Sequence, residues 1–200
     1  MQGYHVVLFV HLVSLLIAAG AAATLHAADL QIRRVPSLSA ALRLALLMKH
    51  AAMAFPVAIV GLVGSGIYMT NHLAWGFSTP WVLAGEVGLG VIVALGDAVN
   101  GRFGRQLGMA IGGALARGGD GPLTDEVRAH LANPVAKLAS MMPTALMFGV
   151  VYVMTVKPGA TGSAVAMLVA VAAGAAGAAA SQVVLREPAA AAEAAAAEPA

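Results

Sequence analysis

Two ionisable residues, His11 and Glu86, fall at one depth inside apolar stretches of this 200-residue sequence. Each lies six or seven residues from the same end of its stretch, or about 10 Å deep at 1.5 Å per helical residue. The phenol of Tyr152 and the small-residue positions Gly64 and Gly66 fall close to the same layer. This set predicts a haem b site in which the glycines leave a flat slot, His11 ligates the haem iron, and Glu86 or Tyr152 tunes it or moves protons.

A plainer interpretation of the same layer stays open. His11 and Glu86 could bond to each other or to nearby hydroxyl groups, because a charge in the bilayer needs compensation. The glycines would then only allow close helix approach.

A second group of possible ligands lies near the same end of the apolar stretches. Met69 and His72 are three residues apart on one helical face, and His5 and Met154 lie near the same interface. Thioether and imidazole ligands suit copper(I), although methionine more often fills space in apolar packing. Copper binding is therefore a further alternative to haem.

The sequence excludes several other kinds of site. It has no cysteine, so disulfides, thiolate zinc sites and iron–sulfur clusters are ruled out. The Gly61–Gly66 segment has the letters of a dinucleotide loop, but no strand precedes it. A net charge of +2 with no basic patch gives no indication of nucleic-acid binding.

The composition requires a lipid environment for the elements that position these residues. Hydrophobic residues make up 60% of the chain and charged residues 10%, with a mean hydropathy of +0.86, which excludes a water-soluble globule. We expect an all-α, polytopic membrane bundle with five transmembrane helices, a four-helix antiparallel core plus a fifth. The five apolar stretches lie near 4–25, 50–71, 80–99, 139–156 and 163–185.

These stretches predict three regions. Residues 1–158 form the four-span membrane bundle, 159–186 the fifth transmembrane helix, and 187–200 a disordered tail of Ala, Glu and Pro. Within the first region, a cytoplasmic helical hairpin covers about 100–137. Glycines and Pro122 over 118–122 break it, and Thr124, followed by two acidic residues, is expected to start its second helix.

The basic residues predict the orientation. With the N-terminus outside and the C-terminus in the cytoplasm, ten of the eleven Lys and Arg residues face the cytoplasm and only Lys157 faces outward. We expect a bacterial inner-membrane protein whose partners are the lipid bilayer and either other membrane subunits or further copies of itself.

Several short motifs follow one another in an order that resembles a known group. They are Phe9-Val10-His11-Leu12-Val13, then Pro56 and Gly66, then Thr79-Pro80-Trp81-Val82-Leu83, and finally Tyr152-Val153-Met154-Thr155-Val156-Lys157-Pro158. This pattern is similar to an uncharacterised family of bacterial integral membrane proteins related to the CopD copper-resistance membrane domain and to HemJ. The resemblance covers about residues 5–158.

The resemblance implies two chemistries. HemJ-like proteins are membrane protoporphyrinogen oxidases that bind haem b through a first-span histidine, which the motif places at His11. They carry a lysine four residues after the span-three tryptophan, where this chain has Gly85, so the oxidase activity does not follow. The CopD relationship implies copper handling. We therefore expect a haem-binding, redox-associated membrane protein, with a structural accessory subunit or a copper-handling permease-like protein as the alternatives.

Overall fold

The computed structural model describes the backbone of residues 2–197, and the side chains in that range except those of residues 2, 97, 98 and 183–197. Every regular element in these residues is a helix, which confirms the all-α class. The elements are α1 (Gln2–Ile32), α2 (Leu38–Ala52), α3 (Ala54–His72), α4 (Pro80–Ala94), a π-helix η1 (Leu95–Asn100), α5 (Gly101–Gly118), α6 (Asp125–Leu131), α7 (Pro134–Val156) and α8 (Ala160–Ala197).

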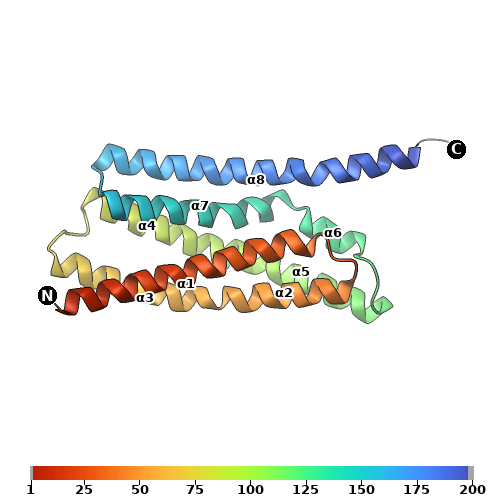
Figure 1. Ribbon diagram of the computed structural model, residues 1–200, viewed down its shortest axis with the longest axis horizontal. Coiled ribbons are helices and arrows are strands. Elements are labelled where there is room, and N and C mark those ends of the chain that lie inside the picture. Colours follow the sequence, from red (N-terminus) through yellow and green to blue (C-terminus); the bar gives the residue numbers. More distant parts are fainter. Residues whose placement is uncertain (1, 198–200) are drawn as a thin grey trace.

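Several elements join into long rods that lie side by side (Figure 1). One turn at Met53 separates α2 from α3, and η1 connects α4 to α5 without a break. Four segments are long and apolar enough to cross a membrane: Gly3–Ile32, Leu38–His72, Asp125–Val156 and Ala160–Gln182. The helix Pro80–Ala94 is apolar but shorter. The membrane-bundle prediction is thus supported. The first two spans, Gly3–Ile32 and Leu38–His72, are longer than the apolar stretches predicted for them, 4–25 and 50–71.

The helices pack in two groups. α1 lies along α3, and α7 lies between α4 and α8. Side chains are small where helices come close: a Cβ on Gly149 of α7 would lie 2.8 Å from the Cβ of Ala170 of α8, and a Cβ on Gly88 of α4 would lie 2.6 Å from Val150. Small residues at these crossings let the backbones approach, as is typical of helices in lipid.

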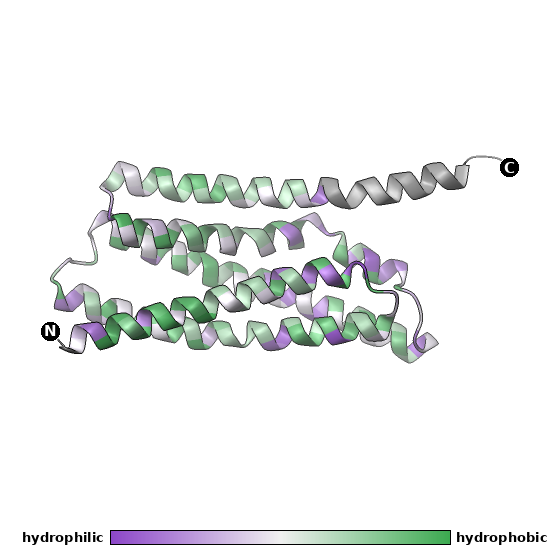
Figure 2. Cartoon of the chain, viewed as in Figure 1, coloured by the Kyte–Doolittle hydropathy of each residue, from purple (hydrophilic) through white to green (hydrophobic). Residues whose placement is uncertain are grey.

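The largest buried cluster lies at one end of the molecule, among the end of α1, α2, α5 and α6. Hydrophilic residues gather around the same end (Figure 2). The fully buried side chains Ile32, Ile111 and Val127 bring α1, α5 and α6 together. α6 begins at the predicted position, because the Thr124 side chain accepts a hydrogen bond from the Val127 amide. The disordered tail predicted over 187–200 falls partly on described backbone: α8 continues as a helix to Ala197, and residues 198–200 lie outside the described residues.

The loop between α5 and α6 holds the start of α2. Asp120 accepts hydrogen bonds from the Ser39 amide at 2.9 Å and the Ser39 hydroxyl at 2.6 Å, and the Leu38 amide donates to the Gly121 carbonyl at 2.8 Å. The hydrogen bonds from Ser39 lower the pKa of the exposed Asp120 carboxyl below its ordinary value. Gly119 adopts a φ of 72° at the end of α5, a conformation that glycine permits.

Candidate functional site

His11 lies in the interface between α1 and α3. Its Nδ1 is 2.9 Å from the Ser65 hydroxyl, which in turn donates to the Gly61 carbonyl one turn earlier. Because the hydroxyl proton is committed to that carbonyl, Ser65 accepts from His11 Nδ1–H, and Nε2 then carries the free lone pair. A Cβ on Gly66 would lie 3.9 Å from the His11 ring, so this glycine borders the imidazole.

Gly64 has a different environment. A Cβ built on it meets no heavy atom within 4 Å, so the residue lies on an open face of α3. The space that it leaves is therefore at the surface of the helix pair and not a slot between packed helices.

Glu86 and Tyr152 lie on outer faces of the bundle. Glu86 does not face the bundle interior, as a place beside His11 would require: its side chain is exposed, while its neighbour Gly85 is buried against the methyl group of Met154 on α7. Successive helical residues are about 100° apart, so burying Gly85 turns Glu86 outward. Tyr152 is 50% exposed for the same reason, because the adjacent Val153 is fully buried. His11 and Gly66 therefore meet, and the carboxyl and phenol predicted to join them lie on outer faces.

The possible copper ligands are engaged with other neighbours. The His72 ring stacks on Tyr68 with centroids 5.5 Å apart, and His5 lies edge-on to Tyr4 at 5.6 Å. Met69 is buried in α3, and Met154 packs against α4. Among the described residues there is no group of three or more His, Asp or Glu side chains placed to hold a metal ion.

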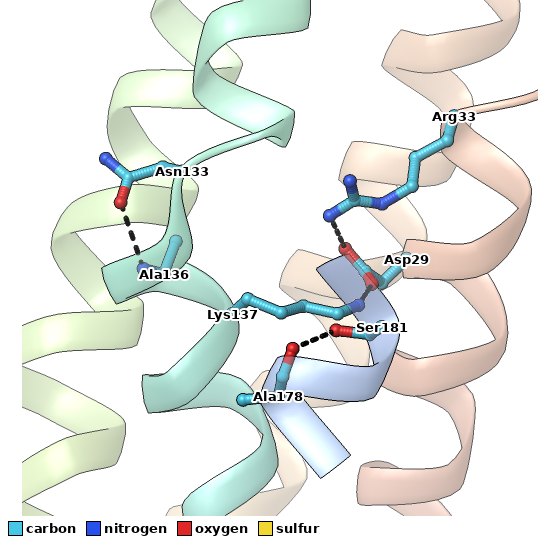
Figure 3. A network of polar contacts seen from close by, with 7 residues as sticks. All are labelled: Asp29, Arg33, Asn133, Ala136, Lys137, Ala178 and Ser181. Atoms are coloured by element: carbon cyan, nitrogen blue, oxygen red, sulfur yellow. Dashed lines mark hydrogen bonds and ion pairs between the residues drawn. The ribbon is translucent and has the colours of Figure 1, made fainter. Parts of the chain in front are cut away.

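A buried polar network lies at the other end of the bundle, where the sequence indicates only salt bridges between residues such as Asp29 and nearby arginines (Figure 3). Lys137 of α7, whose side chain is only 2% exposed, donates to one carboxylate oxygen of Asp29 on α1. Arg33 holds the other oxygen at 3.2 Å. One turn before Asp29, His26 Nε2 lies 2.7 Å from the Thr144 hydroxyl of α7.

The spacing of the polar residues in the sequence indicates two polar helix faces that belong to this network. Residues 26, 29 and 33 of α1 share one helical face, and residues 137 and 144 of α7 are seven apart and share another. The sequence could not reveal that the two faces meet, because the pairing joins residues 108 positions apart.

At the opposite end, Lys157 lies over two indole rings. Its ammonium is 4.1 Å from the Trp75 ring centroid and 5.3 Å from that of Trp81, and the two rings meet edge-to-face at 4.9 Å. Lys157 ends α7 in the left-handed conformation, with a φ of 54°. Such aromatic and cationic groups are typical of a membrane–water interface.

Comparisons of the chain with models of protein families, with curated proteins and with solved structures give no match.

Proposed function

We propose that this chain is an inner-membrane protein with five transmembrane segments, its N-terminus outside and its C-terminus in the cytoplasm. The distribution of basic residues supports this orientation, with ten on one side and Lys157 on the other. α4 has 15 residues, fewer than the roughly 20 that a span needs, but its rod continues through η1 into α5 and supplies the missing length. A reporter fused after residue 200 is expected to lie in the cytoplasm; periplasmic activity would contradict the orientation.

Within that arrangement, we propose that the protein acts as an accessory subunit of a membrane complex. The observation that carries this proposal is the exposed Glu86 side chain in the apolar helix α4. A carboxylate facing lipid inside the bilayer costs about 2.5–3.5 kcal/mol on insertion scales. A partner group that supplies a cation or a hydrogen-bond donor to Glu86 offsets that cost.

The surface around Glu86 has the character of a helix contact. Leu83 and Gly90 lie three and four residues from Glu86, and Val87 is the next residue in the chain. At about 100° per residue, these four positions together cover about 100° of one side of α4. Leu83 is 49% and Val87 58% exposed. A Cβ on Gly90 would meet nothing within 4 Å, so a partner backbone has room to approach. We call these four residues the Glu86 face.

The occupant that fits the Glu86 face is a transmembrane helix of a different subunit carrying a cation or a hydrogen-bond donor. Two copies related by a two-fold axis would place two Glu86 carboxyl groups against each other, which disfavours self-association through this face. A donor helix satisfies the carboxylate and buries Leu83 and Val87 at the same time.

Cysteine-specific photocrosslinking tests this proposal, because the natural chain contains no cysteine. Val87→Cys, labelled with a maleimide photocrosslinker in native membranes, should give one discrete heteromeric product. Glu86→Leu added to Val87→Cys should abolish that product, and Glu86→Gln should weaken it. The matched control is Ile67→Cys on the exposed surface of α3, where Ile67 is 48% exposed, and it should give no such product.

Two outcomes would overturn the accessory-subunit proposal. A product of twice the mass of the chain would make the face a self-association surface. A product that survives Glu86→Leu, or that forms equally from the Ile67→Cys control, would reflect random collision in the membrane.

A second candidate function is b-type haem binding through His11. The observation that favours it is the hydrogen bond to Ser65, since a ligating histidine commonly donates its other ring N–H to an acceptor. A Cβ on Gly66 would only touch the ring, at 3.9 Å, so no bulky side chain crowds the imidazole there. Protein purified from haem-replete cells should then show a Soret band that His11→Ala abolishes. A colourless preparation would contradict haem binding and leave the crosslinking prediction unaffected.

A further inference from the structure

The network at the ends of α1 and α7 carries an unbalanced positive charge. Asp29 contributes one negative charge, and Lys137 and Arg33 contribute one positive charge each, so the three together carry a net charge of +1. Their side chains are 15%, 2% and 12% exposed. Among the residues whose side chains the structure describes, no second carboxylate pairs with Lys137 or Arg33. A buried charge without a counter-charge is costly, so this centre favours an additional anion.

The same centre has more hydrogen-bond donors than acceptors. Among the described residues, Lys137 uses one of its three N–H groups, on Asp29. Three buried nitrogens have no hydrogen-bond partner in the described part of the chain. One is His26 Nδ1, whose role depends on the tautomer, and the other two are N–H donors, Nε of Arg33 and the amide nitrogen of Gln182 on α8. A ligand that supplies only acceptor oxygens would satisfy them.

Helix register places Gln182 at the level of Lys137. α7 and α8 are antiparallel, and a Cβ on Gly149 lies against Ala170 while one on Gly174 lies against Met142. Extending that register by two turns brings residue 182 opposite about residue 136. Three helices therefore direct polar groups to one level of the bundle.

The centre also lies at a suitable depth for a lipid headgroup. The apolar segment Gly3–Ile32 has 30 residues and is thus about 45 Å long, whereas the hydrocarbon core is about 30 Å thick. Several residues at its ends must project into the headgroup region. Asp29 and Arg33 are at one of those ends, where α1 finishes at Ile32.

We propose that Arg33 and Lys137 bind the phosphate group of an anionic phospholipid. The guanidinium fork and the ammonium match phosphate oxygens, and basic pockets between transmembrane helices are known to take such headgroups. One phosphodiester supplies the missing negative charge and the missing acceptors together. The site lies on α1 and α7, so it is independent of the Glu86 face and of the haem candidate.

Lipid titration of the full-length, delipidated protein tests the site by native mass spectrometry. Phosphatidylglycerol should occupy one high-affinity position, and the zwitterionic phosphatidylcholine should not. Arg33→Gln keeps the Asp29–Lys137 pair and should bind phosphatidylglycerol about tenfold more weakly. Lys137→Met also removes the surplus charge and should have a similar effect. Arg34→Gln, at the exposed neighbouring position, is the matched control and should bind as the natural chain does.

A parallel arm distinguishes the lipid from a free ion. Inorganic phosphate is added to the delipidated protein, and the unfolding temperature is measured. Stabilisation by inorganic phosphate that Arg33→Gln abolishes, without a high-affinity phosphatidylglycerol position, would overturn the lipid assignment. Equal phosphatidylglycerol binding by the natural chain, Arg33→Gln and Arg34→Gln would mean that the lipid binds non-specifically around the helices, and it would overturn the proposed site. Binding of neither probe would also overturn the proposal; if Lys137→Met does not fold, Arg33→Gln alone decides.

Discussion

Lys137 of α7 donates a hydrogen bond to Asp29 of α1, across 108 positions of the sequence. α1 otherwise packs mainly along α2 and α3, and α7 mainly along α4 and α8. The ion pair therefore joins the two groups of helices. Arg33 shares the Asp29 carboxylate, so one acidic side chain pairs with two basic ones.

Because Arg33 and Lys137 share this carboxylate, removing the charge of Asp29 should lower the free energy of unfolding more than removing the charge of Lys137. Asp29→Asn leaves Arg33 and Lys137 buried without a counter-charge, and it should lower the free energy of unfolding by about 3–5 kcal/mol. Lys137→Met leaves Asp29 paired with Arg33, and it should cost less. Unfolding by SDS in mixed micelles, followed by circular dichroism, measures both. Equal losses for the two variants would mean that Arg33 does not compensate Asp29.

The sequence predicted the elements that depend on local patterns. Hydropathy identified the apolar stretches because a span needs a long, uncharged run, and Thr124 was recognised as a helix start from its acidic neighbours. The contact of His11 with the Gly66 region followed from counting depth along two helices. Each of these inferences uses only the local sequence and the rise per residue.

The faces of the helices could not be predicted in the same way. Nearly every position of α4 is apolar or glycine, so its sequence has no polar stripe to show which side packs on α7. Glu86 turns outward because Gly85 and Gly88 permit close approach on the adjacent side. Lys137 was assigned to the cytoplasmic side by its charge, which gave no information about its partner on α1. Pairing of helices distant in sequence decided both positions.

Two glycines on α3, one turn apart, are predicted to respond oppositely to alanine. A Cβ on Gly61 would lie 2.0 Å from Ser14 Oγ and 3.0 Å from Ser14 Cβ, so Gly61→Ala forces α1 and α3 apart. We expect a loss of about 1–3 kcal/mol, typical of overpacking. Gly64→Ala meets no atom within 4 Å and should be neutral or stabilising by up to about 1 kcal/mol, because alanine is the better helix former.

Unfolding measurements on the two single variants and on Gly61→Ala/Ser14→Gly check this contrast. Removing the Ser14 side chain should restore part of the stability lost in Gly61→Ala. A Gly61→Ala variant as stable as Gly64→Ala would show that the α1–α3 interface is looser than described.

The hydrogen bonds between Asp120 and Ser39 predict that the attachment of the α5–α6 loop to the start of α2 depends on pH. The hydrogen bonds from Ser39 lower the pKa of Asp120 in the folded protein. The stability that they give the fold is therefore fully present above the pKa of Asp120 in the unfolded chain, near 3.8. It is lost as the pH falls through the lower folded value. A carboxyl NMR titration should find the Asp120 pKa below 3.8 in the natural chain and higher in Ser39→Ala. Identical titration curves would contradict the contact.

The last prediction concerns Lys157, which lies over the only two tryptophans of the chain. Because Trp75 and Trp81 meet edge-to-face at 4.9 Å, their coupled transitions should give a circular-dichroism couplet specific to this cluster. Lys157→Met removes the cation and should weaken the couplet and lower stability by about 0.5–1 kcal/mol, whereas Lys157→Arg should preserve both. Lys157→Gly distinguishes the contribution of the ammonium from that of the backbone conformation. Glycine adopts a φ of 54° without strain but has no ammonium. It should therefore lose the couplet while keeping more stability than Lys157→Met. A couplet unchanged in Lys157→Gly would mean that the indoles hold their arrangement without the cation.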